Sequence, residues 1–171
     1  NLQKKFNFGF KDIQKISINT FHEAKRLEKK HPVSTEEAQY SLPHPVAVAL
    51  IFGKIGAEEV SNPYIINADV AHLREKINVC EKTEYNNSFP EKRFADAKII
   101  LNDGQTIKSE KTEAKGDPEN PLNNFELKKK FRDLTLDVIG EDRSNKIYNK
   151  IINLKNSSSV NEIFKLITDP I

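Results

Sequence analysis

The residues best suited to chemistry, Ser41 and His44, lie at the predicted start of an apolar helix. Pro43 and Pro45 are tolerated only in a first helical turn, so Ser41 is predicted to cap a helix that runs to about Phe52. Unpaired N–H groups and the positive end of the helix dipole favour a carboxylate there. His44 adds a group that can donate or accept a proton near neutral pH. The alternative is that His44 only caps or lines the turn.

A second candidate is the loop Lys115-Gly116-Asp117-Pro118. Gly116 allows a close approach of the backbone, and the ammonium group of Lys115 can pair with a carboxylate. The alternative is a stiff loop that joins a strand to the last helices. The candidate site residues are thus His44 for catalysis and Ser41 and Lys115 for substrate binding. If His44 is catalytic, its side chain is expected to point into an open cleft.

Other kinds of site are not expected. The remaining histidines, His22, His31 and His72, form no i, i+4 pair, so no metal site is predicted. Cys80 is the only cysteine, which excludes an internal disulfide and fits a reducing, cytoplasmic compartment. Glycine-rich nucleotide-binding motifs and a serine-nucleophile motif are missing from the sequence, so no cofactor is expected.

The elements that position these residues are predicted in the order β-α-α-β-β-β, followed by three helices. Ile16 and Ile18 alternate with polar residues within 13–21, and apolar residues recur at every second position in 95–101, which predicts two half-buried strands. Asn102-Asp103-Gly104 predicts a hairpin turn leading to a polar edge strand over 105–113. Ala97, Ile99 and Leu101 are expected to face the apolar helix, which is expected to be buried on every side.

Three amphipathic helices are predicted after the sheet, the first with an apolar stripe at Leu127, Phe131, Leu134 and Val138 and the last opening at a capping box on Ser159. The predicted fold class is α+β, with a small, mostly antiparallel sheet packed on helices and followed by a carboxy-terminal helical segment. The expected domains are an α+β domain over residues 1–122 and helices over 123–171.

Composition narrows the function classes. The chain has 171 residues and a net charge of +2, with no basic footprint for nucleic acid. No apolar run approaches the roughly 20 residues that cross a membrane, and no signal peptide opens the chain. The chain contains no methionine, even at position 1, so it is expected to be part of a longer protein.

Two stretches, 34–53 and 115–132, together resemble the MmgE/PrpD family, which includes 2-methylcitrate dehydratase, cis-aconitate decarboxylase and an iminodisuccinate epimerase. The resemblance implies the carboxy-terminal domain of a cofactor-independent lyase, a dehydratase or decarboxylase of a small polycarboxylate. It also implies a missing amino-terminal helical domain, against which residues 123–171 pack, and a homo-oligomer such as a dimer. Family members often carry a Tyr implicated in catalysis where this chain has His44, so the reaction stays open.

The fragment alone is expected to be inactive, because most catalytic residues of the family lie in the helical domain. The alternative from another class is a free-standing binding or regulatory module derived from that domain. The coding sequence upstream of Asn1 separates the two, because only the enzyme requires a helical domain there.

Overall fold

A computed structural model describes residues 2–156 and 160–170, and the chain divides into two compact units, Asn1–Ala114 and Lys115–Ile171. The first unit contains α1 (Leu2–Phe6), η1 (Phe10–Asp12), β1 (Ile13–Thr20), α2 (His22–Lys25), α3 (Thr35–Gln39), α4 (Pro43–Phe52), η2 (Glu58–Val60), α5 (Asn62–Ile65), α6 (Ala68–Glu75), β2 (Ile77–Glu81), α7 (Thr83–Asn86), β3 (Phe94–Leu101), β4 (Thr106–Lys108) and β5 (Thr112–Glu113). The second contains α8 (Asn124–Ile139), α9 (Glu141–Ile152), η3 (Leu154–Asn156) and α10 (Asn161–Thr168).

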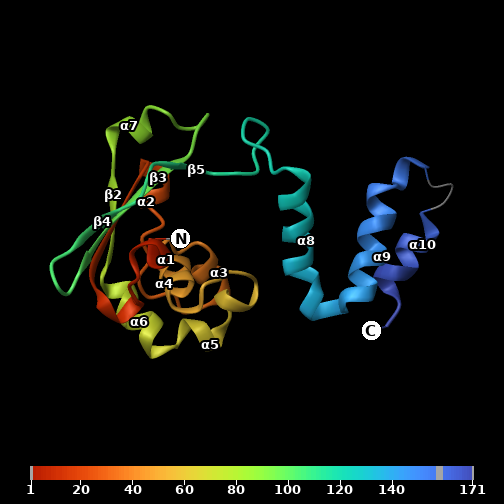
Figure 1. Cartoon of the computed structure of the whole chain (residues 1–171), viewed down its shortest axis with the longest axis horizontal. Coiled ribbons are helices and arrows are strands. Elements are labelled where there is room, and N and C mark those ends of the chain that lie inside the picture. Colours follow the sequence, from red (N-terminus) through yellow and green to blue (C-terminus); the bar gives the residue numbers. More distant parts are fainter. Residues whose placement is uncertain (1, 157–159, 171) are drawn as a thin grey trace. The chain divides into compact units, whose positions relative to one another are not determined.

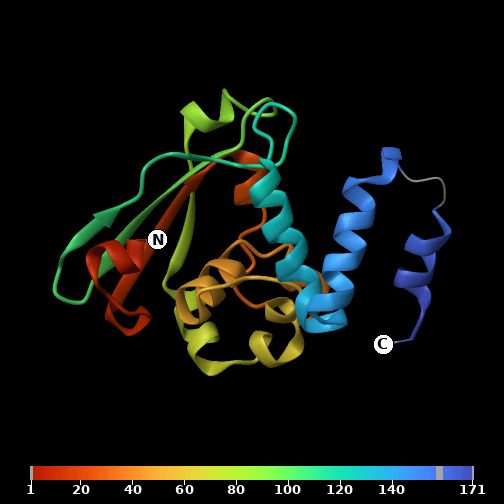
Figure 2. The ribbon, with the colours of Figure 1, turned by 45° about the vertical axis from the view of Figure 1, so that its right-hand side comes forward.

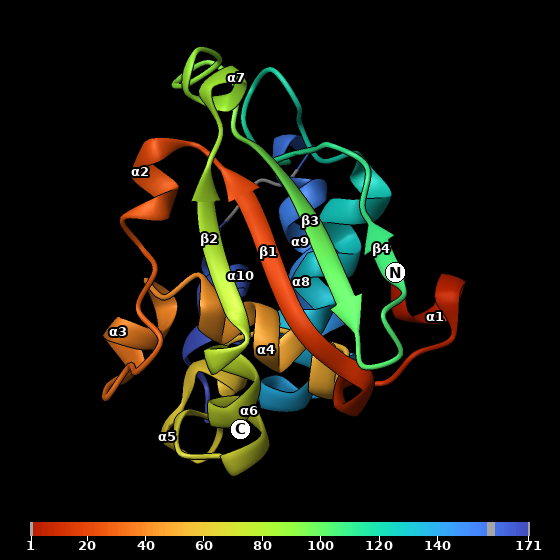
Figure 3. The same cartoon turned by 90° about the vertical axis from the view of Figure 1, so that its left-hand side faces the viewer.

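The sheet of the first unit has the strand order β2-β1-β3-β4, and β5 pairs with β3 outside this path (Figure 3). β1 runs parallel to β2, whereas β3 pairs antiparallel with β1, β4 and β5. A parallel pair needs a long crossover, and residues 21–76 supply it as helices α2 to α6. The α+β class and the mostly antiparallel sheet are thus confirmed.

The predicted hairpin is confirmed as the connection between β3 and β4. Its turn contains Gly104 at a φ of 87°, a left-handed conformation that favours glycine. Ile99 lies opposite Ile107 in the register, and both side chains are buried. Ile107 is thus the apolar anchor of an otherwise exposed return strand.

The core lies between this sheet and α4, with α6 beside it. Ile16 and Ile99 of the sheet share one buried cluster with Ala47 and Val48 of α4. Burying a side chain of the size of Ile16, Ile99 or Val48 stabilises the fold by about 1.5–3 kcal/mol. The expectation that α4 is buried on every side is wrong, because the sheet covers only one face of the helix. Its other apolar residues are half-buried, and Phe52 is exposed.

The described part of the second unit contains the α-helices α8, α9 and α10, with the short η3 after α9 (Figures 1 and 2). Phe131 of α8 lies 5.8 Å from Tyr148 of α9, measured between ring centroids. Leu127, Leu134 and Val138 remain exposed within the described residues. The capping box expected at Ser159 lies outside the described residues. The two compact units divide after Ala114, where the chain leaves the sheet beyond β5, and the expected domains over residues 1–122 and 123–171 stay a prediction.

Candidate functional site

Ser41 holds the start of α4. Its hydroxyl accepts a hydrogen bond from the backbone N–H of His44 at 3.1 Å and donates one to the carbonyl of Lys29 at 2.5 Å. A side-chain oxygen that accepts from an N–H three residues later is the usual N-cap arrangement. Gly53, with a φ of 78°, ends the helix in the left-handed conformation. The predicted end of this helix at Gly53 is therefore confirmed, and the Ser41 hydroxyl bonds to the first turn as predicted, although Leu42 is the residue that directly precedes the helix.

The backbone donors in the first turn of α4 are already used. The N–H of Leu42 donates to the carbonyl of Leu27 at 2.8 Å, and that of His44 to Ser41. Pro43 and Pro45 have no N–H to offer. The expectation of unpaired N–H groups facing a carboxylate is thus wrong, because a neighbouring loop, the serine hydroxyl and two prolines complete the turn.

The imidazole ring of His44 is enclosed and bonded at both nitrogens. Its side chain has 0% exposure, Nε2 lies 3.0 Å from the carbonyl oxygen of Glu59, and Nδ1 lies 3.2 Å from a guanidinium nitrogen of Arg74. A guanidinium group can only donate, so Nδ1 accepts and the Nε2–H donates to Glu59. The expectation that the ring points into an open cleft is wrong.

The surroundings of His44 keep its ring neutral. Burial lowers the pKa of His44 below its usual 6.5, and the charge of Arg74 lowers it further, against the hydrogen bond to Glu59, which raises it. A second guanidinium nitrogen of Arg74 donates to the carbonyl of Ile65 at 3.0 Å. The pair therefore joins α4 to η2, α5 and α6. As it stands, this ring connects elements and has no free nitrogen for proton transfer.

Glu59 is the carboxylate of the same buried cluster, with 2% exposure. The ammonium nitrogen of Lys54 lies 3.0 Å from its Oε1, an ion pair that does not meet hydrogen-bond geometry. The close contact with the Glu59 carboxylate and its negative charge raise the pKa of Lys54. Arg74 Nε has no hydrogen-bond partner among the described residues. The backbone carbonyl of Glu59 thus contacts His44, whereas its carboxylate pairs with Lys54, which follows the end of α4.

Sequence reasoning missed both Glu59 and Arg74. A signal existed for Arg74, because it follows Val70 by four residues and so falls on the buried stripe of α6 with Leu73. A charged residue on such a stripe requires a polar partner in the core. Glu59 belongs to a three-residue 3₁₀ helix with no comparable periodicity.

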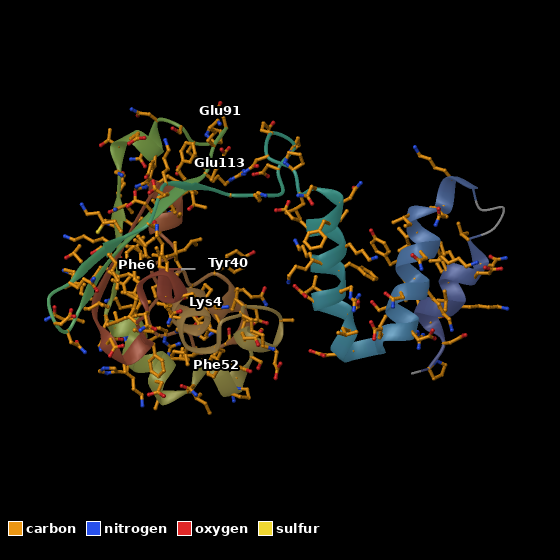
Figure 4. All side chains as sticks on the ribbon, viewed as in Figure 1. Lys4, Phe6, Tyr40, Phe52, Glu91 and Glu113 are labelled. Atoms are coloured by element: carbon orange, nitrogen blue, oxygen red, sulfur yellow. The ribbon has the colours of Figure 1, made fainter. Side chains whose placement is uncertain are left out.

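An open cavity of about 480 Å³ lies beside this cluster. It is lined by α3, by Pro45 in the first turn of α4, and by residues 55–57 and Val60. The lining side chains that the structure describes include Thr35 and Gln39 but no titratable group, and His44 is not among them. The side chain of Tyr40, the residue after α3, projects away from the ribbon and is 69% exposed (Figure 4). The cavity can hold a small ligand but offers no acid or base of its own.

Lys115 belongs to the second unit, whereas Ser41 and His44 are brought together in the first. Its ammonium nitrogen lies 2.5 Å from Glu126 Oε1, and this hydrogen bond lowers the pKa of Glu126. Glu126 also forms the capping box of α8 with Asn123. Gly116 has a φ of 117° and donates its N–H to Asn120. These contacts are those of a loop folded onto the start of α8.

The remaining histidines lie apart. His22 pairs with Glu81 at 3.1 Å and His31 with Glu75 at 3.2 Å, both at the surface. Among residues 2–156 and 160–170, no group of three or more His, Cys, Asp or Glu side chains is placed to hold a metal ion. Within the same residues, none of the helices combines the length and apolarity that a membrane crossing requires.

Comparison with known proteins gives a consistent result. The family model described as MmgE/PrpD C-terminal domain matches residues 1–154. A cis-aconitate decarboxylase-like protein of Aspergillus oryzae is 26% identical over 144 residues, covering 82% of this chain and 29% of the relative. The 2-methylcitrate dehydratase of Escherichia coli O157:H7 is 33% identical over 95 residues, covering 53% of this chain and 20% of the relative. A probable 2-methylcitrate dehydratase of Saccharomyces cerevisiae is 33% identical over 104 residues, covering 57% of this chain and 20% of the relative.

Proposed function

The chain belongs to the MmgE/PrpD family, as its carboxy-terminal domain, and from this membership we propose that it is the carboxy-terminal domain of a lyase acting on a small polycarboxylate. The observation that carries the proposal is the family match over residues 1–154, which includes the whole sheet unit and α4. The names of the relatives point to dehydration of 2-methylcitrate or decarboxylation of cis-aconitate. The chain spans less than a third of the length of these relatives.

The proposal extends to the partners of this domain. We propose that the reaction needs no cofactor and that an amino-terminal helical domain completes the enzyme. We also propose that the enzyme is a homo-oligomer and is cytoplasmic. The exposed apolar residues Leu127, Leu134 and Val138 of α8 are consistent with further protein surface packing on them, because exposed side chains of this size in one stripe are costly in water.

Within this domain we assign Ser41 and His44 a positioning role. Together with Arg74 they fix the first turn of α4, and Pro45 of that turn lines the open cavity. A catalytic role for His44 stays a prediction, and it requires the ring to leave Glu59 and Arg74 when substrate binds. Substrate binding by Ser41 and Lys115 likewise stays a prediction.

A hybrid enzyme tests the proposed function. Residues 1–154 of this chain would replace the matching domain of the Escherichia coli 2-methylcitrate dehydratase. Turnover of 2-methylcitrate and of cis-aconitate would then be compared with that of the same enzyme lacking the domain. We expect turnover in the hybrid and none without the domain. A hybrid that unfolds cooperatively yet acts on neither compound would contradict the proposal.

The same hybrid separates the two roles of His44. A positioned acid or base contributes about 10²-fold or more to turnover. His44→Ala would therefore lower the rate per folded molecule by that factor if the ring is catalytic, and His44→Tyr would retain more activity. The positioning role predicts instead that both variants lose stability, with an unchanged rate per folded molecule.

One observation favours a free-standing binding module as a second candidate. The described lining of the cavity near α4 carries no titratable side chain, so the cavity by itself suits binding rather than chemistry. Calorimetric titration of the chain with 2-methylcitrate and cis-aconitate tests this alternative. Saturable binding by the isolated chain, together with an inactive hybrid, would support the module.

A further inference from the structure

The face of the sheet that points away from α4 carries a cationic pocket. Figure 3 views this face, with α4 behind the strands. A cavity of about 400 Å³ opens here and is lined by four lysines, Lys82, Lys98, Lys108 and Lys111, and by a single carboxylate, that of Asp96. The whole chain has a net charge of only +2, so this local excess of positive charge is not a consequence of composition.

Two of the lysines face each other across neighbouring strands. Lys98 of β3 lies directly opposite Lys108 of β4 in the antiparallel register. Like charges in this position repel and destabilise the pair of strands. Neither lysine has an ion-pair partner among the residues that the structure describes. An anion between the two ammonium groups would remove the repulsion.

The carboxylate in the pocket already accepts hydrogen bonds from three neighbouring side chains. Asp96 accepts hydrogen bonds from Asn19 at 2.6 Å, from Lys82 at 2.9 Å and from the hydroxyl of Tyr85 at 2.5 Å. Burial raises the pKa of Asp96, but these hydrogen bonds outweigh it, so the pKa is lowered and the group is ionised. Asp96 therefore holds Lys82 at the pocket wall and is not free to bind Lys98 or Lys108.

The fourth lysine contributes more weakly. Lys111 lies 3.3 Å from Glu84, in an ion pair whose side chains are both about half exposed or more. Such pairs contribute little in water and exchange readily with solvent ions. Lys111 can therefore turn towards an anion in the pocket at little cost.

We propose that this pocket binds a compact oxyanion with two or more negative charges, as presented by a phosphate group or by a small polycarboxylate. Lys98 and Lys108 contact the anion from the strands, and Lys82, held by Asp96 and Tyr85, contacts it from the rim. The site is on the opposite face of the sheet from Ser41 and His44. It does not depend on the lyase activity proposed above.

The test uses the full chain with inorganic phosphate, citrate and acetate at equal ionic strength. Backbone amide signals of β3 and β4 are followed by NMR during each titration. We expect saturable shifts at Lys98 and Lys108 with phosphate or citrate, with a dissociation constant on the order of 1 mM or below. Tighter binding of phosphate would identify a phosphate-bearing ligand, and tighter binding of citrate a polycarboxylate.

A matched pair of variants controls for total charge. Lys98→Gln combined with Lys108→Gln should weaken binding at least tenfold, whereas Lys4→Gln combined with Lys130→Gln should leave it within about twofold. Lys4 and Lys130 are exposed, and replacing both removes the same total charge as replacing Lys98 and Lys108. Without ligand, the first double variant should melt at the same or a higher temperature, since it removes a repulsion. Equal weakening in both double variants, equal shifts with acetate, or no saturable shift would overturn the proposal.

Discussion

Acidification should weaken the first unit through His44, and the sign follows from its surroundings. Burial holds the pKa of this ring below its usual 6.5, so the folded protein keeps it neutral at pH values where the unfolded chain already binds a proton. Stability rises with increasing pH wherever the unfolded state binds more protons than the folded state, so acidification lowers it. The neutral His44 ring therefore contributes its full stability above about pH 7.5. This contribution is lost as the pH falls below about 6.5, towards the lowered pKa of His44 in the folded state.

The size of the loss is bounded by the titration of one group. A histidine that titrates near pH 6.5 when unfolded and stays neutral when folded destabilises the protein by at most about 1.4 kcal/mol between pH 7.5 and 5.5. The loss at His44 has this sign and stays within this limit, because burial lowers its pKa and Arg74 donates to the nitrogen that would accept the proton.

Urea unfolding at the two pH values measures this loss. The NMR methyl signals of Val48, which is buried on the core side of α4, report on the first unit alone. His44→Gln should abolish most of the pH-dependent difference, even though it lowers stability at both pH values. His72→Gln is the matched control, because His72 is exposed on α6, and it should keep the difference. An unchanged pH dependence in His44→Gln would refute the neutral, doubly bonded ring.

Three further outcomes are expected. Ser41→Ala removes both hydrogen bonds of the buried hydroxyl and should lower the free energy of unfolding by about 1–3 kcal/mol in urea melts; a loss below about 0.5 kcal/mol would contradict the capping role. Gly104→Ala, at a φ of 87°, should cost about 1–2 kcal/mol, whereas Gly9→Ala, at a φ of −98°, should cost clearly less; equal losses would argue against the strained turn. Leu134→Lys should shift the sedimentation profile of the chain towards monomer, because Leu134 is 54% exposed on α8; a wild-type chain that is monomeric at all concentrations would refute this.

Much of the fold was predictable because its determinants are local. Alternation at Ile16 and Ile18 identifies the central strand, since successive side chains of a strand point to opposite faces. Asn102-Asp103-Gly104 identifies the hairpin because its residues tolerate the required backbone angles. The hydroxyl of Ser41 bonds to the N–H group three residues later, and such a contact depends on sequence spacing alone.

The state of the candidate site was decided by contacts between distant segments. His44 meets Arg74 thirty positions later and Glu59 fifteen positions later, and the N–H of Leu42 is taken by Leu27. The sequence alone determined that a capped helix begins at Ser41 and that a histidine lies in its first turn. Only the tertiary structure decided that the donors of this turn are satisfied and that the ring is enclosed. The reason is that a buried polar group must find its partner wherever the packed chain brings one, and no local pattern encodes that choice.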